Sequence, residues 1–191
     1  DGAEYGIQLS YATESVPLGT AGSGAVVEPS REEMDLLLAA ALSCDAHVVR
    51  DDMHGSWHIK GDPTEGAIIV AAAKAGMQKD DLDLQFPRVG EIPFTSETKR
   101  MTTLHSVGDA QVAYAKGAPE TILDSCSRQR TSQGEVALGD ADRKVILEAV
   151  REMAGEALRV LGVARKADAT LGDAERDMTF LGLVGMIDPP R

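Results

Sequence analysis

The sequence predicts one α+β domain, in which a mostly antiparallel twisted sheet is flanked by helix pairs. Three observations predict this fold class. Strand-like segments follow one another in hairpins and meanders, and amphipathic helical segments alternate with them. No internal repeat is visible along the 191 residues. This length suits a single domain with a sizeable hydrophobic core.

Composition excludes several other classes of protein. Charged residues make up 26% of the chain and apolar residues 43%, which is ordinary for a soluble globular protein. No apolar run approaches the roughly 18 residues of a membrane span, and residues 1–20 lack the basic start and apolar stretch of a signal peptide. Cys44 and Cys126 lie far apart and form no Cys-x-x-Cys motif, which favours a reduced cytosolic setting.

The net charge narrows the choice of partners. Lys and Arg total 19 against 31 Asp and Glu, which gives −12. This acidity argues against nucleic acid and against an anionic membrane surface as partners. A site for any anionic ligand therefore has to concentrate positive charge locally, against an unfavourable overall field.

The first third of the chain predicts a strand, a linker and a helix. Residues 1–12 alternate between apolar and polar side chains, as a strand does. Residues 19–24 are small and flexible, and no Gly-Lys-Ser/Thr follows them that would make a phosphate-binding loop. Ser30 and Glu33 form a capping box. The helix that it begins is expected to end near Cys44.

Two strands and two helices are expected next. Residues 46–49 and 57–60 are strand-like on either side of a turn. Asp62 and Pro63 then suit the N-cap and first position of a helix that Gly76 ends. A short acidic helix is expected over residues 79–84.

The middle of the chain predicts a hairpin that follows a polar loop. Residues 89–94 form a strand that leads into the loop at residues 95–99. Residues 100–107 and 110–116 then pair around Gly108 and Asp109. A short helix is expected over residues 119–126, and the polar segment 127–139 is expected to be a loop with a brief strand.

The last third predicts a long helix and two strands. An amphipathic helix is expected over residues 141–158. Residues 160–164 are apolar and β-prone enough for a central strand, residues 168–177 form a loop, and residues 178–187 form the last strand. The candidate buried positions of the long helix are Val145, Leu147, Val150, Met153 and Leu158.

The end of the hairpin carries the strongest chemical signal. Lys116 ends a strand, Gly117 removes the side chain where the backbone bends, and Pro119 and Glu120 suit the first turn of a helix. A lysine beside such a position can meet a phosphate or a flat ring that approaches the main chain closely. The alternative is a strand-to-helix turn with a solvated lysine.

Five segments of the sequence resemble motifs of one known protein family. Lys-Gly-Ala-Pro-Glu at residues 116–120 resembles the nucleotide-site motif of the P-type cation-transporting ATPases. Four further segments resemble other motifs of that family, in family order, and with the first they cover roughly residues 30–191. They are Lys-Gly-Asp-Pro-Thr-Glu-Gly-Ala at 60–67, Pro-Phe-Thr-Ser-Glu-Thr-Lys-Arg-Met-Thr at 93–102, Leu-Arg-Val-Leu-Gly-Val-Ala at 158–164 and Gly-Met-Ile-Asp-Pro-Pro-Arg at 185–191.

The resemblance implies a nucleotide-binding (N) domain that spans residues 1–191 and is excised from a larger membrane pump. Residues 1–26 are then a first strand and linker, and residues 188–191 a hinge that returns to the phosphorylation domain. The motif at residues 60–67 and Cys126 look most like the calcium-pump branch and its prokaryotic relatives. The setting implied is a cytoplasmic domain of an integral plasma-membrane protein.

The family's mechanism implies what such a domain does. It would hold ATP with Mg²⁺ and deliver the γ-phosphate to an aspartate in the adjacent phosphorylation domain, beside an actuator domain of the same chain. Neither the family's Asp-Lys-Thr-Gly-Thr motif nor its Gly-Asp-Gly-x-Asn-Asp motif occurs here. No catalytic residue is therefore expected in this segment, whose contribution would be to position the nucleotide. The transported cation would bind elsewhere in the pump.

The resemblance places Phe94 and Glu65 at the adenine. Phe94 would stack on the base, which is worth roughly 1–3 kcal/mol; the alternative is a core phenylalanine. Glu65 would accept from the adenine amino group. Its alternative role is the third helical residue of a capping box, reaching back to the N-cap amide.

The remaining site residues implied by the resemblance concern the phosphates. Lys99 and Lys116 would lie at the nucleotide, with the Lys116 stem beside the adenine and its head toward the phosphates, and Gly117 would permit the close approach. Arg159 would bind the phosphate chain; alternatively it is a rim arginine paired with an acid. Many members have an arginine where Ser96 stands, so one phosphate contact is lost unless Arg100 or Thr98 replaces it.

Asp62 matches an acidic position that could meet the Mg²⁺ of the nucleotide.

Two other functions compete with nucleotide delivery. One is a non-catalytic interaction domain of the same fold that has lost nucleotide binding. Ser96 in place of an arginine and the net charge of −12 are compatible with this alternative. The other is a free-standing hydrolase with Asp62 and Glu65 as an acid pair, which lacks a nearby nucleophile or histidine.

Overall fold

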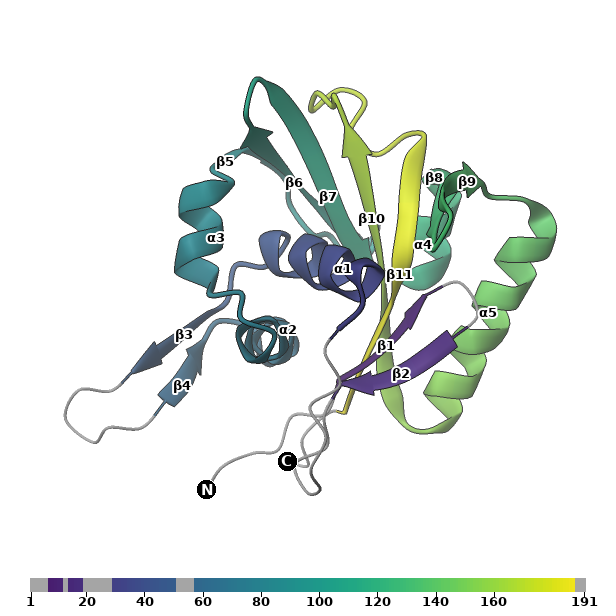
Figure 1. The fold of residues 1–191 in the computed structure, drawn as a ribbon, viewed down its shortest axis with the longest axis horizontal. Helices are drawn as coiled ribbons and strands as arrows, with labels where there is room; N and C mark the ends of the chain where they lie inside the picture. Colours follow the sequence, from purple (N-terminus) through teal and green to yellow (C-terminus); the bar gives the residue numbers. More distant parts are fainter. Residues whose placement is uncertain (1–6, 12–13, 19–28, 51–56, 188–191) are drawn as a thin grey trace.

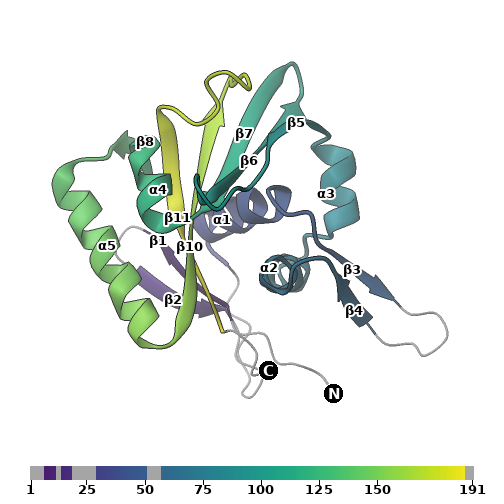
Figure 2. The ribbon, with the colours of Figure 1, turned by 180° about the vertical axis from the view of Figure 1, so that it is seen from behind.

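The structure is a computed structural model, and it describes residues 7–11, 14–18, 29–50 and 57–187. Within these ranges, nine strands form one sheet and two more form a separate hairpin. Helices cover both faces of the large sheet (Figure 1), with α1, α2 and α3 on one side and α4 and α5 on the other. The opposite view shows the same division (Figure 2). The α+β fold class is confirmed.

The large sheet is almost wholly antiparallel. Its main path runs in the order β2-β1-β11-β10-β7-β6-β5, and β8 joins it by a parallel pairing to β11. The strands of the path are β1 (Ile7–Tyr11), β2 (Glu14–Leu18), β5 (Arg88–Ile92), β6 (Arg100–Val107), β7 (Ala110–Gly117), β10 (Leu158–Ala167) and β11 (Met178–Ile187). The other strands are β8 (Cys126–Thr131) with its partner β9 (Gly134–Ala137), and the separate pair β3 (His47–Arg50) and β4 (Trp57–Lys60).

The helices begin where the capping residues predict. Ser30 and Glu33 form the expected capping box at the start of α1 (Arg31–Leu42), and the Asp62 side chain caps α2 (Pro63–Lys74). The other helices are α3 (Lys79–Gln85), α4 (Pro119–Asp124) and α5 (Asp140–Gly155). An acid in the first turn of α1 and α2 also complements the helix dipole.

Two main hydrophobic clusters hold the layers together. The first joins α1 and α2 to one face of the sheet, and the second joins α4 and α5 to the other face. Small residues allow α1 and α2 to approach closely, because alanines from both helices lie in the first cluster. Fully burying one leucine or isoleucine of these clusters contributes about 1.5–3 kcal/mol. Among their buried members are Leu36, Leu37, Ile68, Tyr114 and Val184 in the first and Ile122, Ile146, Met153, Phe180 and Leu183 in the second.

Several elements match the prediction closely. The hairpin of β6 and β7 pairs Arg100 with Gly117 and turns at Gly108, which has a φ of 61°. The predicted central strand lies inside β10, whose neighbours are β7 and β11. The last strand, β11, has the predicted bounds. Its Met186 lies opposite Ile7, so the first and last described strands are neighbours.

Three predictions about elements are wrong. Residues 127–139 are not mainly a loop, because β8 and β9 form a hairpin there. The long helix ends at Gly155, so Leu158 begins β10 instead of ending a helix. Val145 is 50% exposed, and the buried positions of α5 are Ile146 and Met153.

The N-terminal segment also differs from its prediction. It holds two short strands, β1 and β2, where one strand over residues 1–12 was expected. The predicted linker at residues 19–24, the turn between the strands of the β3–β4 pair and the predicted hinge at residues 188–191 lie outside the described residues.

Candidate functional site

Lys116 lies at the end of β7 and points toward the layer of α1 and α2. It is 6% exposed, so the alternative of a solvated lysine is wrong. The Lys116 Nζ lies 2.8 Å from Oε1 of Glu65 on α2. It also donates to the backbone carbonyl of Ser43, just after α1, and lies 3.5 Å from Sδ of Met101. The lysine head is thus directed to the Glu65 carboxylate and the Ser43 carbonyl.

Glu65 is held through both of its carboxylate oxygens. While Oε1 faces Lys116, Oε2 accepts from the backbone amides of Asp45 at 2.8 Å and Ala46 at 3.0 Å. The capping-box alternative for Glu65 is therefore wrong, because its carboxylate serves the turn after α1. The first turn of α2 is capped by Asp62, whose Oδ1 accepts from the amides of Thr64 and Glu65.

Gly117 allows two backbone segments to touch. A Cβ at this position would lie 2.3 Å from the Lys99 carbonyl oxygen and 2.7 Å from Cα of Arg100. The next residue, Ala118, donates its amide to the same carbonyl at 2.9 Å. The loop before β6 is thereby fixed against the strand end that carries Lys116.

The loop at residues 95–99 is ordered by its own hydrogen bonds. The Lys99 amide donates to the Thr95 carbonyl at 2.8 Å, and Lys99 has a φ of 50°, which is uncommon for a residue with a side chain. The hydroxyls of Thr95 and Thr98 lie 2.7 Å apart. Ser96 and Lys99 are both exposed on this loop.

Phe94 lies just beyond β5 and directly before this loop. Its side chain is 60% exposed, so the alternative of a core phenylalanine is wrong. Burying a large aromatic ring is among the most favourable contributions to folding. An exposed one at the edge of a loop is consequently available to a ligand.

The two arginines considered for the phosphates point to different places. Arg159, near the start of β10, donates from Nη1 to Oγ1 of Thr64 at 2.7 Å and so reaches the first turn of α2. Arg100 lies on the other face of the sheet, where it binds the Glu175 carboxylate and donates to Ser125 Oγ at 2.7 Å. Arg100 is therefore engaged elsewhere and does not replace the guanidinium missing at Ser96.

The structure thus brings together most of the predicted residues. Glu65 and Lys116 are in direct contact, Gly117 is joined to Lys99 through the main chain, and Arg159 reaches Thr64 beside Glu65. Sequence reasoning missed the turn at residues 43–46, which supplies one carbonyl to Lys116 and two amides to Glu65. Because these are backbone groups, no residue type in the sequence could have signalled them.

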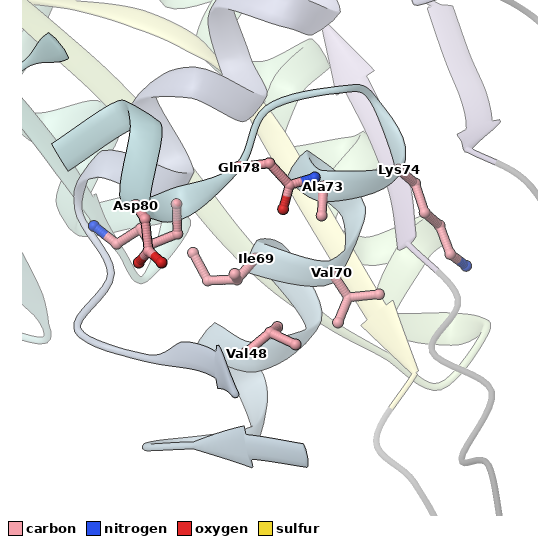
Figure 3. Close-up of a pocket in the computed structure, with 8 residues that line it drawn as sticks. Val48, Ile69, Val70, Ala73, Lys74, Gln78 and Asp80 are labelled. Carbon is pink, nitrogen blue, oxygen red and sulfur yellow. The ribbon is translucent and has the colours of Figure 1, made fainter. Parts of the chain in front are cut away.

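A cavity of about 470 Å³ lies elsewhere, between α2, α3 and β3 (Figure 3). It is mostly apolar and contains none of the predicted site residues. Its lining is Val48, Ile69, Val70, Ala73, Lys74, Gln78, Lys79 and Asp80. Within the described ranges, no cluster of three or more His, Cys, Asp or Glu side chains could hold a metal ion.

Comparison with known sequences now decides the family. The family model described as the P-type ATPase cytoplasmic domain N matches residues 32–191. The chain belongs to the P-type ATPases, as their domain N. Its buried Lys116–Glu65 pair and its Gly117 contact are thus features of an N domain.

Relatives of this N domain are named as cation pumps. It is 43% identical over 161 residues to the probable cation-transporting ATPase F of Mycobacterium tuberculosis. The aligned residues make up 81% of this chain and 17% of the relative. It is 42% identical over 135 residues to calcium-transporting ATPase 1 of Bacillus cereus, in an alignment that covers 69% of this chain and 15% of the relative. It is 38% identical over 173 residues to the sodium/potassium exporting P-type ATPase cta3 of Schizosaccharomyces pombe, in an alignment that covers 86% of this chain and 16% of the relative.

The N domain accordingly spans only 15% to 17% of the length of these relatives. In the part of the chain that the structure describes, no helix combines the length and the apolar character needed to cross a membrane.

Proposed function

We propose that this N domain holds ATP and delivers its γ-phosphate to an aspartate in the adjacent phosphorylation domain of a cation pump. The buried pair of Lys116 and Glu65 supports the proposal best. A lysine that is 6% exposed and ends a strand at a glycine contact is a costly arrangement for stability alone. Lys116 contacts Glu65 on α2, and the adjacent Gly117 touches the Lys99 carbonyl at the end of the loop at residues 95–99, so the ion pair lies near two segments proposed to bind the ligand.

The adenine would be bound by Phe94 and Glu65. The exposed ring of Phe94 offers a face for stacking. Each carboxylate oxygen has two lone-pair sites, so Oε1 of Glu65 can accept from an adenine amino group while Lys116 remains bound. Lys116 offsets the negative charge of that acceptor, which would otherwise repel a nucleotide.

The phosphates would meet Lys99 and Arg159. Lys99 is exposed on the loop that Gly117 fixes, and the side chain of Arg159 extends from β10 to the first turn of α2. These cations concentrate positive charge in a chain of net charge −12, which an ATP site requires. Ser96 supplies no guanidinium, so the affinity would be modest. Mg²⁺ would arrive with the nucleotide, and Asp62 is the acid proposed to lie near it.

The parent protein would be an integral plasma-membrane pump. Its phosphorylation and actuator domains would be the partners of this N domain, and the cation would bind outside it. Ca²⁺ is the proposed cation, because the motif at residues 60–67 and Cys126 look most like the calcium-pump branch. A relative in Bacillus cereus is named as a calcium transporter, and one in Schizosaccharomyces pombe as a sodium/potassium exporter.

An ATP titration followed by two-dimensional NMR tests the proposal. The amide signals near Glu65, Phe94, Lys99 and Lys116 should shift together, and Phe94→Ala should weaken the response without unfolding the chain. Val145→Ala is the matched control, because Val145 is an exposed apolar residue on α5. A dissociation constant near 1 mM corresponds to only about 4 kcal/mol, so concentrations must reach several millimolar. A folded sample in which saturating ATP shifts no signal would overturn ATP binding and favour the interaction domain.

A further inference from the structure

The turn at residues 43–46 connects α1 to β3 and supports both members of the buried ion pair. Its Ser43 carbonyl accepts from Lys116, and its Asp45 and Ala46 amides donate to Glu65. The position of the pair therefore depends on the shape of this turn.

Arg88, on β5, is bound to the same turn from the other side. Its Nη2 donates to the carbonyls of Cys44 at 3.0 Å and Leu42 at 3.3 Å. Its Nη1 donates to Oδ1 of Asp45 at 2.6 Å and to Oε2 of Glu91 at 3.0 Å. One guanidinium thus contacts the last residue of α1, Leu42, and two residues of the turn, Cys44 and Asp45.

Physical chemistry explains why an arginine is needed here. The last carbonyls of a helix lack intrahelical partners and carry partial negative charge. The last turn of α1 has no basic residue of its own, so Arg88 supplies the cation from β5. Burial lowers the pKa of Arg88, but the hydrogen bonds and charges of Asp45 and Glu91 outweigh this and raise it above its ordinary value.

We propose that Arg88 is a positioning residue for nucleotide binding, which acts by fixing the turn that holds Glu65 and Lys116. This inference rests on the proposed function for its effect on ATP. Arg88 itself does not touch the ion pair among the described contacts. Lysine cannot reproduce its action, because an ammonium is a point charge without the planar fork that reaches two carbonyls and two carboxylates.

The test compares Arg88→Lys and Arg88→Gln with the control Arg165→Lys in the 191-residue chain. Arg165 is also half-buried and paired, 2.6 Å from Glu135, but it lies on β10 away from the turn. The readouts are the amide NMR signals of Asp45 and Ala46 and the dissociation constant of ATP. We expect both Arg88 variants to shift these two signals and to weaken ATP binding about threefold to tenfold. Arg165→Lys should do neither.

A double-mutant cycle separates positioning from general loss of stability. If Arg88 acts through Glu65, then Arg88→Lys should weaken ATP binding less in a Glu65→Gln background than in the wild-type chain. An equal fold-change in both backgrounds, or ATP binding that Arg88→Lys leaves unchanged, overturns the proposal.

Failure of the proposed function gives a different result. In that case the wild-type chain itself does not bind ATP, while the Asp45 and Ala46 signals still report on the turn. If the Asp45 and Ala46 signals shift in Arg88→Lys, the result supports the inference that Arg88 fixes the two amides that donate to Glu65. If these signals stay unchanged, the inference is overturned.

Discussion

Lys116 and Glu65 form an ion pair that joins the end of β7 to the first turn of α2, with 2.8 Å between Nζ and Oε1. Both side chains are largely buried. The carboxylate keeps two backbone amides as further partners, so the pair belongs to a network and is not an isolated surface contact.

Removing the cation from this pair should destabilise the fold. Lys116→Met keeps the length of the side chain and leaves the Glu65 carboxylate buried without its cation. We expect a loss of about 3 kcal/mol in the free energy of unfolding, at the lower end of what breaking a buried pair costs. Urea denaturation at neutral pH measures this loss. The double variant Lys116→Met/Glu65→Gln should lose less than the sum of the single variants, and strict additivity would contradict the coupling.

Phe94 should matter for ATP and not for stability. Phe94→Ala removes a ring that is 60% exposed, so the free energy of unfolding should change by less than about 0.5 kcal/mol. ATP binding should weaken by roughly 1–3 kcal/mol through loss of stacking. Calorimetric titration beside urea denaturation checks both quantities, and Phe94→Tyr should retain binding. An unfolding midpoint that falls as steeply as for a core substitution would be inconsistent with the exposed position.

Gly117 should be intolerant of even one methyl group. Gly117→Ala places a Cβ 2.3 Å from the Lys99 carbonyl, so the backbone of Lys99 and Arg100 has to move. We expect a loss of about 1–3 kcal/mol in stability, together with displaced amide signals in the loop at residues 95–99. The control is Gly155→Ala, at the end of α5, where a Cβ would meet nothing within 4 Å. That variant should be neutral or slightly stabilised, since alanine favours a helix over glycine.

The buried His105 should make the free energy of unfolding depend on pH. Its ring is fully buried, with Nδ1 2.8 Å from the Phe86 carbonyl and Nε2 3.0 Å from the Thr103 hydroxyl. An Nδ1–H donor and an Nε2 acceptor satisfy both contacts, which is the neutral ring. Burial lowers the pKa of His105 from its ordinary 6.5. The unfolded chain therefore binds the extra proton more readily, and stability falls as the pH drops below 6.5 toward the folded pKa.

Urea denaturation of the wild-type chain and of His105→Gln between pH 7.5 and pH 5.5 isolates this effect. The variant should be less stable at high pH but should lose less stability on acidification, because glutamine does not titrate. Parallel stability curves for the two proteins would show that His105 does not cause the dependence.

Most of the fold was predictable because local signals and tertiary packing agree. The capping box at Ser30 fixes the start of α1, and the glycine at 108 fixes the turn of the β6–β7 hairpin. The strand β8 was missed because its sequence is polar. It forms through pairing with β9 and β11, and ion pairs such as Arg130 with Asp35 hold it to α1. In α5 the predicted apolar face is right at Met153, which is buried, and wrong at Val145, because the neighbouring Ile146 is the buried residue there.

The candidate site was predictable as a set of residues but not as a geometry. The motifs identified Glu65 and Lys116 separately, and nothing in the spacing showed that they contact each other. Their pairing follows from the packing of α2 against the end of β7, which is a tertiary relationship. The backbone groups of residues 43–46 were invisible because every residue carries them.

The pairing of β1 with β11 has a consequence for how such a domain is built into a longer protein. Because Ile7 lies opposite Met186, the chain enters and leaves the sheet on adjacent strands. A fold with this property can be inserted at a single surface position of a host without stretching either protein. The same property should allow this domain to be exchanged between related hosts as a cassette, with only two neighbouring junctions to match.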